Sequence, residues 1–340
     1  MPQIGIGHAI GFSEEAAWGT VETTVDNFLD AEPGSLSVRH VSERIQGEEL
    51  LTRGILSSSV AKGTELVEGT LQFKPRYGGG WVLFLAQLNG IDPTTAGAGP
   101  YTHTFNLGAS VASANNFTKG ISLFADREGM IGAAGSKAAA YTGCRPTSLE
   151  LAFEQNARAA ATVEFIGETL DSFGTRPTVT LSTREFIVSP SPATSPTAFL
   201  TWNAVAYVVK SASFKIEQEQ ELRRNMQGPK ILQPVPGGRM KITGSFTCEA
   251  PATGASSGGA FYDDYNAKTM RQLVLTADGS SANAKLALTL PRCLITSSPE
   301  PEIAGPGVVM TTVEFEAYYF SGDARFGQFV LTTDDSTAWA

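Results

Sequence analysis

The tetrapeptide Thr162-Val163-Glu164-Phe165 occurs a second time as Thr312-Val313-Glu314-Phe315. Each copy follows a cysteine, Cys144 or Cys293, at nearly the same distance. Four repeated residues can arise by chance in a chain of 340 residues, but the matching cysteines make chance a poorer explanation. We therefore predict that the chain contains two copies of one module.

Other features recur around the tetrapeptide in the same order. Each half begins with a charged strand that ends in a Gln-Gly pair, followed by a strand that opens with glycine, a short helix and an alternating apolar run. An ordered set of matches is better evidence for duplication than a single match. The matched pairs are Gln46-Gly47 with Gln227-Gly228, Gly69-Thr70-Leu71 with Gly244-Ser245-Phe246, residues 81–88 with 262–270, and Ile121-Ser122-Leu123-Phe124 with Lys285-Leu286-Ala287-Leu288.

Length and composition agree with two β-rich modules. The 340 residues fit two domains of ordinary size better than one, and abundant Gly, Ser, Thr and Val favour strands and turns. We predict a mainly β fold with two tandem β-sandwich domains, each with a flanking short α-helix and a long inter-strand loop. The expected boundaries are an N-terminal arm at 1–27, a first domain at 28–170, a connector at 171–205 with its proline-rich stretch at 189–196, a second domain at 206–322 and a C-terminal arm at 323–340.

The net charge of −9 bears on possible partners. A tight nucleic-acid binder needs clustered Lys and Arg to neutralise phosphates, so this class is disfavoured, whereas a surface that lets DNA pass without adhering is compatible with the charge. No apolar run approaches the roughly 20 residues of a membrane span, and residues 1–12 lack a secretory signal pattern. Three well-separated cysteines fit reduced thiols in a cytoplasm.

No catalytic pattern stands out. His8, His40 and His103 are scattered without metal-site spacing, and the sequence has no nucleophile elbow, Cys-x-x-Cys pair or phosphate loop. Two carboxylates flanking a sugar stay open as an alternative, since β-sandwich hydrolases have no short motif for them. We expect no enzyme activity, no cofactor and no bound metal.

Residues 46–66 join two predicted strands with far more chain than a hairpin needs, and connections of this length are usually functional or disordered. This one carries apolar residues, which disordered linkers avoid. We therefore expect it to dock on another molecule; the alternative is a loop folded back on its own sandwich. The residues expected to bury are Leu50, Leu51, Ile55 and Leu56.

Two predicted strand regions carry acidic side chains on one face. In 147–166, which reads as a hairpin, apolar residues alternate with Glu150 and Glu154. In 214–224, the alternate positions hold three glutamates with Lys215 and Arg223 among them. An ordinary solvated face is the simpler interpretation of this pattern taken alone. The three glutamates are Glu217, Glu219 and Glu221.

The ordered pattern resembles the phage tail tube proteins of long non-contractile tails, in particular those with two tandem tube domains. The resemblance covers most of the chain and is one of order rather than of a chemical motif. It is carried by Gly11 to Thr20 with its Glu-x-x-x-Gly-Thr character, residues 66–73 running into 81–90, residues 101–105, Tyr141-Thr142-Gly143-Cys144, residues 162–167, Leu290-Pro291-Arg292-Cys293 and Gly305-Pro306-Gly307.

The resemblance implies a structural virion protein that assembles into stacked rings, forming a hollow tail tube that conducts viral DNA into the host. It implies that the 47–66 loop reaches the neighbouring ring. Two modules per chain suggest a trimeric ring imitating six-fold symmetry, the alternative being a hexamer with the second module outside. The expected partners are further copies of the chain, the tape-measure protein, tail terminator and tail tip proteins and passing DNA, with no membrane; the expected location is the virion tail, assembled in the host cytoplasm. The acidic faces would then line the channel.

A different class of function stays open, namely a β-sandwich surface-binding module such as an adhesin or a carbohydrate-binding domain. Such a module is expected to cluster exposed aromatic residues in a loop. The four tryptophans are dispersed along the chain instead, which favours the tube. They are Trp18, Trp81, Trp202 and Trp339.

Overall fold

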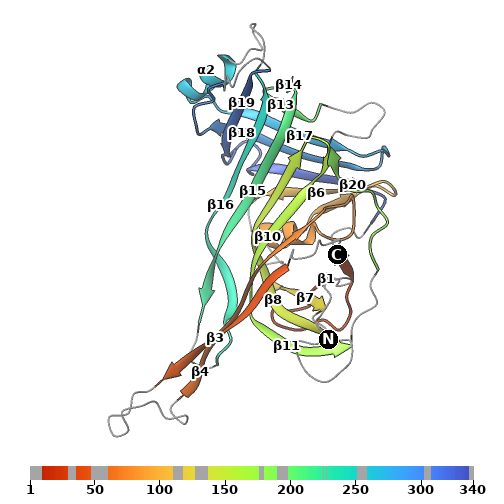
Figure 1. The fold of residues 1–340 in the computed structure, drawn as a ribbon, viewed down its shortest axis with the longest axis vertical. Coiled ribbons are helices and arrows are strands. Elements are labelled where there is room, and N and C mark those ends of the chain that lie inside the picture. The colour runs from red at the N-terminus through yellow and green to blue at the C-terminus, as the bar shows by residue number, and fades with distance from the viewer. Residues whose placement is uncertain are drawn as a thin grey trace.

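The structure is a computed structural model, and it is mainly β, which confirms the predicted fold class (Figure 1). We refer to residues 10–175 as the first module and to residues 198–336 as the second module. The described residues are 10–29, 36–46, 60–109, 118–126, 137–175, 180–189, 198–224, 226, 228–250, 259–301 and 308–336.

In the described part of the first module, one short helix lies among the strands. Its elements are β1 (Ile10–Glu14), β2 (Asn27–Leu29), β3 (Leu36–Gln46), β4 (Val60–Phe73), α1 (Leu83–Asn89), β5 (Thr94–Ala96), β6 (Tyr101–Leu107), β7 (Ile121–Asp126), β8 (Lys137–Glu154), β9 (Ala157–Arg158), β10 (Ala160–Gly167) and β11 (Thr169–Thr175).

The second module follows β12 (Val188–Ser189), which pairs with β9, and repeats the order of the first module without counterparts of β5, β6 and β9. Its elements are β13 (Leu200–Trp202), β14 (Val205–Tyr207), β15 (Val209–Arg223), β16 (Leu232–Glu249), α2 (Gly259–Ala267), β17 (Arg271–Asp278), β18 (Lys285–Ile295), β19 (Met310–Ala317) and β20 (Gly327–Thr333).

One antiparallel sheet runs through both modules in the order β3-β4-β10-β8-β15-β16-β19. We call it the long sheet. Two further groups of strands form the other layers. In the first module the order is β2-β1-β7-β8-β11, and in the second it is β14-β13-β17-β18-β20-β6-β5. The strand β8 belongs to two layers because its 18 residues are long enough to serve both.

The matched sequence features occupy matched places. In the first module Phe165 pairs with Gly69, and in the second Phe315 pairs with Gly244. Each glycine lets a phenylalanine ring lie against its backbone, since a Cβ added at Gly69 would lie 2.9 Å from Phe165 Cζ and one added at Gly244 would lie 2.5 Å from Phe315 Cζ. The repeated tetrapeptide therefore follows from repeated packing.

The two helices differ in burial. Every residue of α1 is buried, and Gly90 ends the helix in the left-handed conformation with φ of 71°. In α2, Tyr262 and Asp263 are exposed, while Asp264 is buried and accepts hydrogen bonds from Trp202 and Arg271. A helix that is apolar all round is covered, and a more polar one lies at the surface.

The ends of the chain differ in part from the predicted arms at 1–27 and 323–340. Strand β1 pairs with β2 and β7 and buries Phe12, while β20 pairs with β18 and β6 and buries Phe329 and Leu331. Alternating apolar residues in a strand are stabilised by covering one face, and both strands do this within the subunit. The predicted connector, 171–205, likewise contains most of β11 together with β12 and β13.

Candidate functional site

The two modules are joined by direct strand pairing. Strands β8 and β15 form seven antiparallel pairs, from Ser211 opposite Glu154 to Glu217 opposite Ser148. Beneath the pairs, Leu149, Leu151, Phe153, Phe214 and Ile216 are buried, so the joint has a continuous apolar side. The opposite side of the same strands is polar.

The end of the β15–β16 hairpin extends onto the first module. The Glu65 N–H donates to the Pro229 carbonyl at 2.7 Å, and Lys230 Nζ lies 3.8 Å from Glu168 Oε1. Arg145 Nη1 donates to the Pro234 carbonyl at 3.2 Å, and burial lowers the pKa of this guanidinium to about 10. The hairpin of the second module is thus held by main-chain and ionic contacts on the first.

A buried carboxylate lies behind this contact. Glu15 is 0% exposed and accepts hydrogen bonds from the Gly143 N–H at 2.7 Å, the Gly19 N–H at 2.8 Å and Ser122 Oγ at 3.0 Å. Burial raises the pKa of Glu15 to about 7, against the opposing effect of these donors, with a further increase from the nearby Glu168. The Glu-x-x-x-Gly-Thr pattern and the Tyr-Thr-Gly-Cys pattern of the sequence therefore meet at one carboxylate.

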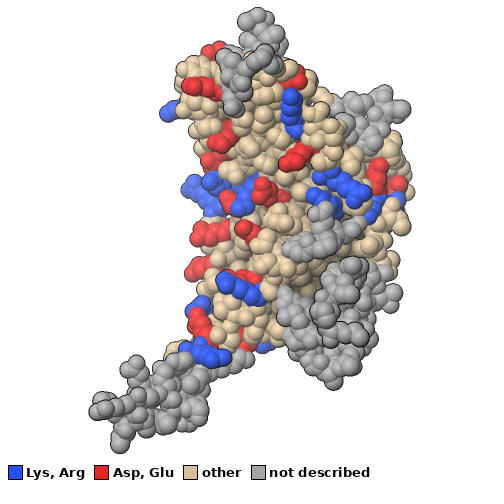
Figure 2. Space-filling model, in the orientation of Figure 1, with Lys and Arg blue, Asp and Glu red and all other residues tan. Residues whose placement is uncertain are grey.

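The exposed side of the long sheet forms a polar face across both modules. Acidic side chains outnumber basic ones on it, and Lys215 Nζ lies 2.8 Å from Glu217 Oε1 and 3.9 Å from Glu164 Oε2. Acidic and basic side chains gather along the side of the molecule where β15 and β16 run (Figure 2). The charged residues of the polar face are Arg39, Glu68, Glu150, Glu154, Glu164, Lys215, Glu217, Glu219, Lys241, Glu314 and Glu316.

Four of the five predicted channel glutamates lie on the polar face: Glu150, Glu154, Glu217 and Glu219. The fifth, Glu221, is exposed but lies beyond a register shift between Gln218 and Gln220, after which the strict alternation of β15 is lost. A bulge of this kind changes the direction in which the following side chains point, so Glu221 is not assigned to the polar face.

Sequence reasoning did not list the glutamates of the repeated tetrapeptide as site residues. Glu164 and Glu314 are both exposed on the polar face, and each is paired with the small residue Thr70 or Ser245 on the neighbouring strand. The repeat itself was the available signal, because equal positions of two repeated strands face the same side of one sheet. The predicted docking residues Leu50, Leu51, Ile55 and Leu56 lie outside the described residues.

The described residues contain no group of three or more His, Cys, Asp or Glu side chains that could hold a metal ion. Cys144, Cys248 and Cys293 are buried as free thiols, and burial raises the pKa of each. None of the helices in the described part of the chain is long and apolar enough to cross a membrane.

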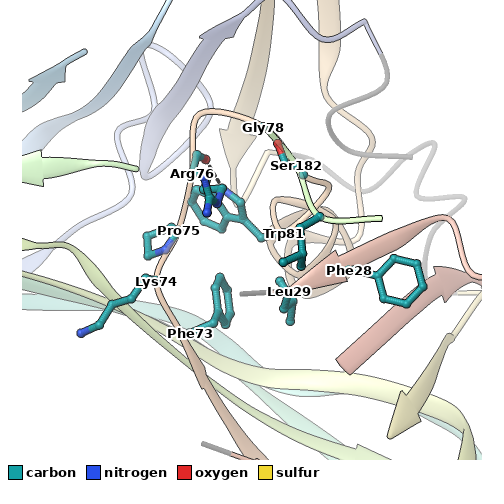
Figure 3. Close-up of a pocket in the computed structure, with 11 residues that line it drawn as sticks. Phe28, Leu29, Phe73, Lys74, Pro75, Arg76, Gly78, Trp81 and Ser182 are labelled. Atoms are coloured by element: carbon teal, nitrogen blue, oxygen red, sulfur yellow. Dashed lines mark hydrogen bonds between the residues drawn. The ribbon is translucent and has the colours of Figure 1, made fainter. Parts of the chain in front are cut away.

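A small cavity lies where β4 leads into α1. Phe73, Trp81 and Leu29 crowd around it, and Trp81 Nε1 donates to the Arg76 carbonyl at 2.8 Å (Figure 3). Its volume of about 10 Å³ has room for about one water molecule. The cavity is therefore a packing gap.

Comparison with known proteins identifies the family. None of the curated proteins matches the chain. A protein-family model described as phage tail tube protein matches residues 5–317, which covers the first module and the second module to the end of β19. A continuous sheet with one polar face agrees with a structural role in a tail. The chain belongs to the phage tail tube protein family.

Proposed function

We propose that three copies of this chain form a ring, that rings stack into a hollow tube, and that the tube conducts viral DNA through the tail. The observation that carries the proposal is the β8–β15 joint, which unites two similar modules in one sheet. A contact that links one module to the next within a chain is able to link successive chains as well. Repeated around an axis, such a head-to-tail contact closes a ring.

The strands that would form the contact between copies are defined by the repeat. Strand β15 corresponds to β3, and β8 corresponds to β18. Counted from the matched Cys144 and Cys293, the part of β8 that pairs with β15 matches sequence positions 297–303, which follow β18. The proposed contact therefore joins β3 of one copy to this stretch of the next copy. Among the described pairings β3 is an edge strand, hydrogen-bonded to β4 alone. An edge strand presents unpaired N–H and C=O groups to a partner strand. Three such contacts alternate with three internal joints around the ring.

The polar face suits the inner wall. DNA that meets clustered Lys and Arg is held by counterion release, whereas glutamates, serines and threonines offer it no such attraction. Lys215 is paired with Glu217 and lies near Glu164, so its charge is partly neutralised. The opposite side of the sheet is apolar and covered, and therefore is not available to line a water-filled channel.

The continuous sheet supports the proposed stoichiometry of three copies. A ring of six copies with the second module as external decoration is the alternative. It is disfavoured because β15, β16 and β19 of the second module continue the same sheet as β3, β4, β10 and β8 of the first. We further propose tape-measure, tail terminator and tail tip proteins as partners, assembly in the host cytoplasm, and a purely structural role without enzyme activity, metal or cofactor.

Electron microscopy of the purified protein tests the ring. We expect hollow tubes whose rings hold three copies and show six similar modules around the channel. Six copies per ring, with the second modules outside the channel wall, would support the alternative. A persistent monomer under all polymerising conditions would refute the assembly proposal.

Charge reversal tests the channel. A triple variant in which Glu217, Glu219 and Glu221 are each changed to Lys is expected to form intact tubes but to eject DNA more slowly. The slowing should be stronger at low salt, because the attraction between Lys and phosphate is then screened less. A matched control reverses three exposed acids away from the polar face, Asp92, Asp263 and Asp334. Equal ejection rates for the two triple variants at low salt would show that these glutamates do not line the path.

A further inference from the structure

The second module carries an open groove with aromatic and sulfur-containing walls. The groove lies beside β16 and the end of β19, and encloses about 1210 Å³. Its walls include Tyr318 and Met270, each 37% exposed, and Tyr319, which is 48% exposed. Clustered exposed apolar side chains of this kind mark an interaction site. Further lining comes from the buried Met240, from Ala317 and Phe326, from the charged Arg239, Lys241 and Glu316, and from Asn89, Gly108 and Ala109 of the first module.

The register of the strands relates one wall of this groove to the first module. Met240 precedes Gly244 by four residues, as Glu65 precedes Gly69, and both glycines pair with the phenylalanine of the repeated tetrapeptide. Met240 pairs with Gln218 on β15, as Glu65 pairs with Ser42 on β3. Met240 is therefore the counterpart of Glu65.

A second wall residue has the same relationship. Tyr318 follows the repeated tetrapeptide at the distance at which Glu168 follows it in the first module. The backbone agrees, since the Glu168 N–H donates to Thr142 at 2.9 Å and the Tyr318 N–H donates to Arg292 at 2.8 Å. Glu65 and Glu168 are the residues that receive the β15–β16 hairpin. The groove thus occupies, on the second module, the place that the hairpin covers on the first.

The chemistry changes on both sides of this contact. On the first module the receiving residues are acidic, and the incoming hairpin presents Lys230. On the second module the receiving residues are Met240 and Tyr318. Counted back from Gly69, the sequence position that matches Lys230 is Ile55, which is followed by Leu56. The Met and Tyr side chains of the groove are complementary to the Ile55-Leu56 pair, as the acidic surface is to Lys230.

We infer that the groove receives the β3–β4 hairpin of a second copy of this chain, as the first module receives the β15–β16 hairpin of its own chain. The inference rests on the proposed function, because it needs a neighbouring copy. The β3–β4 hairpin projects beyond the first module, toward the end of the molecule opposite α2, and the β15–β16 hairpin runs in the same direction (Figure 1). A copy placed end to end would present its second module there. The partner is then in the same ring, whereas the sequence suggested the next ring.

Paired cysteines test the contact. Glu65 and Lys230 are bridge partners within the chain, and backbones at strand spacing bring Cα atoms into the range that a disulfide spans. Glu65→Cys with Lys230→Cys is therefore the control and should form a bond within one chain. Met240→Cys, combined in turn with Gly54→Cys, Ile55→Cys or Leu56→Cys, should form a bond between chains. The assay is a non-reducing gel of oxidised, assembled tubes.

The expected product is a covalent oligomer that stops at the number of copies in one ring, for at least one of the three pairs. Unlimited polymers would show that the hairpin docks on the next ring, and tubes without inter-chain bonds would show that it docks elsewhere; each result overturns the inference. Wild-type protein that forms no tubes refutes the proposed function instead, so the two failures are distinguishable.

A substitution in the groove gives a second measurement. Tyr318→Glu should raise the critical concentration for polymerisation at least about 10-fold, because it places a charge in an apolar contact, whereas Tyr318→Phe should leave it within about 2-fold. An unchanged value for Tyr318→Glu in a folded subunit overturns the inference. Binding of a carbohydrate to the two tyrosines without any effect on polymerisation would overturn it as well.

Discussion

The two modules share an order of strands but differ in how their equivalent surfaces are covered. On the first module, Glu65 and Glu168 contact the hairpin of the same chain. On the second, the equivalent positions, Met240 and Tyr318, line an open groove. The difference shows how one subunit combines a permanent internal joint with a surface suited to another copy.

A second difference lies next to the first. In the second module β13 and β14 are joined by the turn Asn203-Ala204, whose residues have φ of 51° and 63°. In the first module the matching strands, β1 and β2, are joined by residues 15–26, which begin with the buried Glu15. The connection in the first module is longer and contains the carboxylate of Glu15, which accepts hydrogen bonds from the Gly143 and Gly19 N–H groups. The second module has no carboxylate at the matching position.

The largest effect is expected from removing the end of the β3–β4 hairpin. Deleting residues 48–60 should leave a folded subunit that does not polymerise, because four apolar side chains would lose a contact worth roughly 6–12 kcal/mol before the costs of association. Circular dichroism checks folding and electron microscopy checks polymerisation. Long tubes from the deletion variant would show that this hairpin makes no essential contact between copies.

The next effect concerns pH and Glu15. Its pKa is about 7 in the folded chain and near 4.5 in the unfolded chain, so between these values only the unfolded chain loses the proton. The free energy of unfolding should therefore fall as pH rises through this window, by up to about 3 kcal/mol, and then become constant above about pH 7.

Glu15→Gln removes the titrating group and should flatten this part of the pH profile, even though the amide replaces one acceptor and lowers stability overall. The measurement is denaturant unfolding of the unpolymerised subunit between pH 4.5 and 8. Parallel profiles for the two proteins would place the pH dependence elsewhere. In the second module the matching strands, β13 and β14, are joined by the tight turn Asn203-Ala204, which has no carboxylate. This turn is therefore expected to add no pH dependence in the same range.

Much of the fold was accessible from the sequence because alternation and repetition are local signals. The interpretation of 147–166 as a hairpin is confirmed by the β8–β10 pairing, in which Thr162 lies opposite Glu150. The short helix expected at 81–88 is α1, at Leu83–Asn89. These features depend on side chains a few residues apart, which the sequence displays directly.

The joint and the groove were not accessible in the same way. Nothing in β15 alone specifies β8 as its neighbour, since an antiparallel strand with one apolar face fits many partners. The pairing of β6 from the first module with β20 from the second also spans over two hundred residues. The β15–β16 hairpin covers a surface of the first module, and the matching surface of the second module is left open as the groove. Only the comparison of the two modules locates this groove.

The smallest effect, and the closest comparison of the modules, concerns the two glycines under the repeated phenylalanines. Gly69→Ala and Gly244→Ala should each lower the free energy of unfolding by about 1–3 kcal/mol, because the added methyl group forces the phenylalanine ring away. Gly244→Ala should lower it at least as much as Gly69→Ala does, because the added Cβ is closer to its neighbours. It would lie 2.5 Å from both Phe315 Cζ and Ser213 O, whereas a Cβ at Gly69 would lie 2.9 Å from Phe165 Cζ and 2.6 Å from Ser37 O. Gly228→Ala is the control, because a Cβ there meets no atom within 4 Å and should change stability by less than about 0.5 kcal/mol. Denaturant unfolding of the unpolymerised subunit measures all three variants, and glycine variants as stable as the control would show that the rings do not pack on these strands.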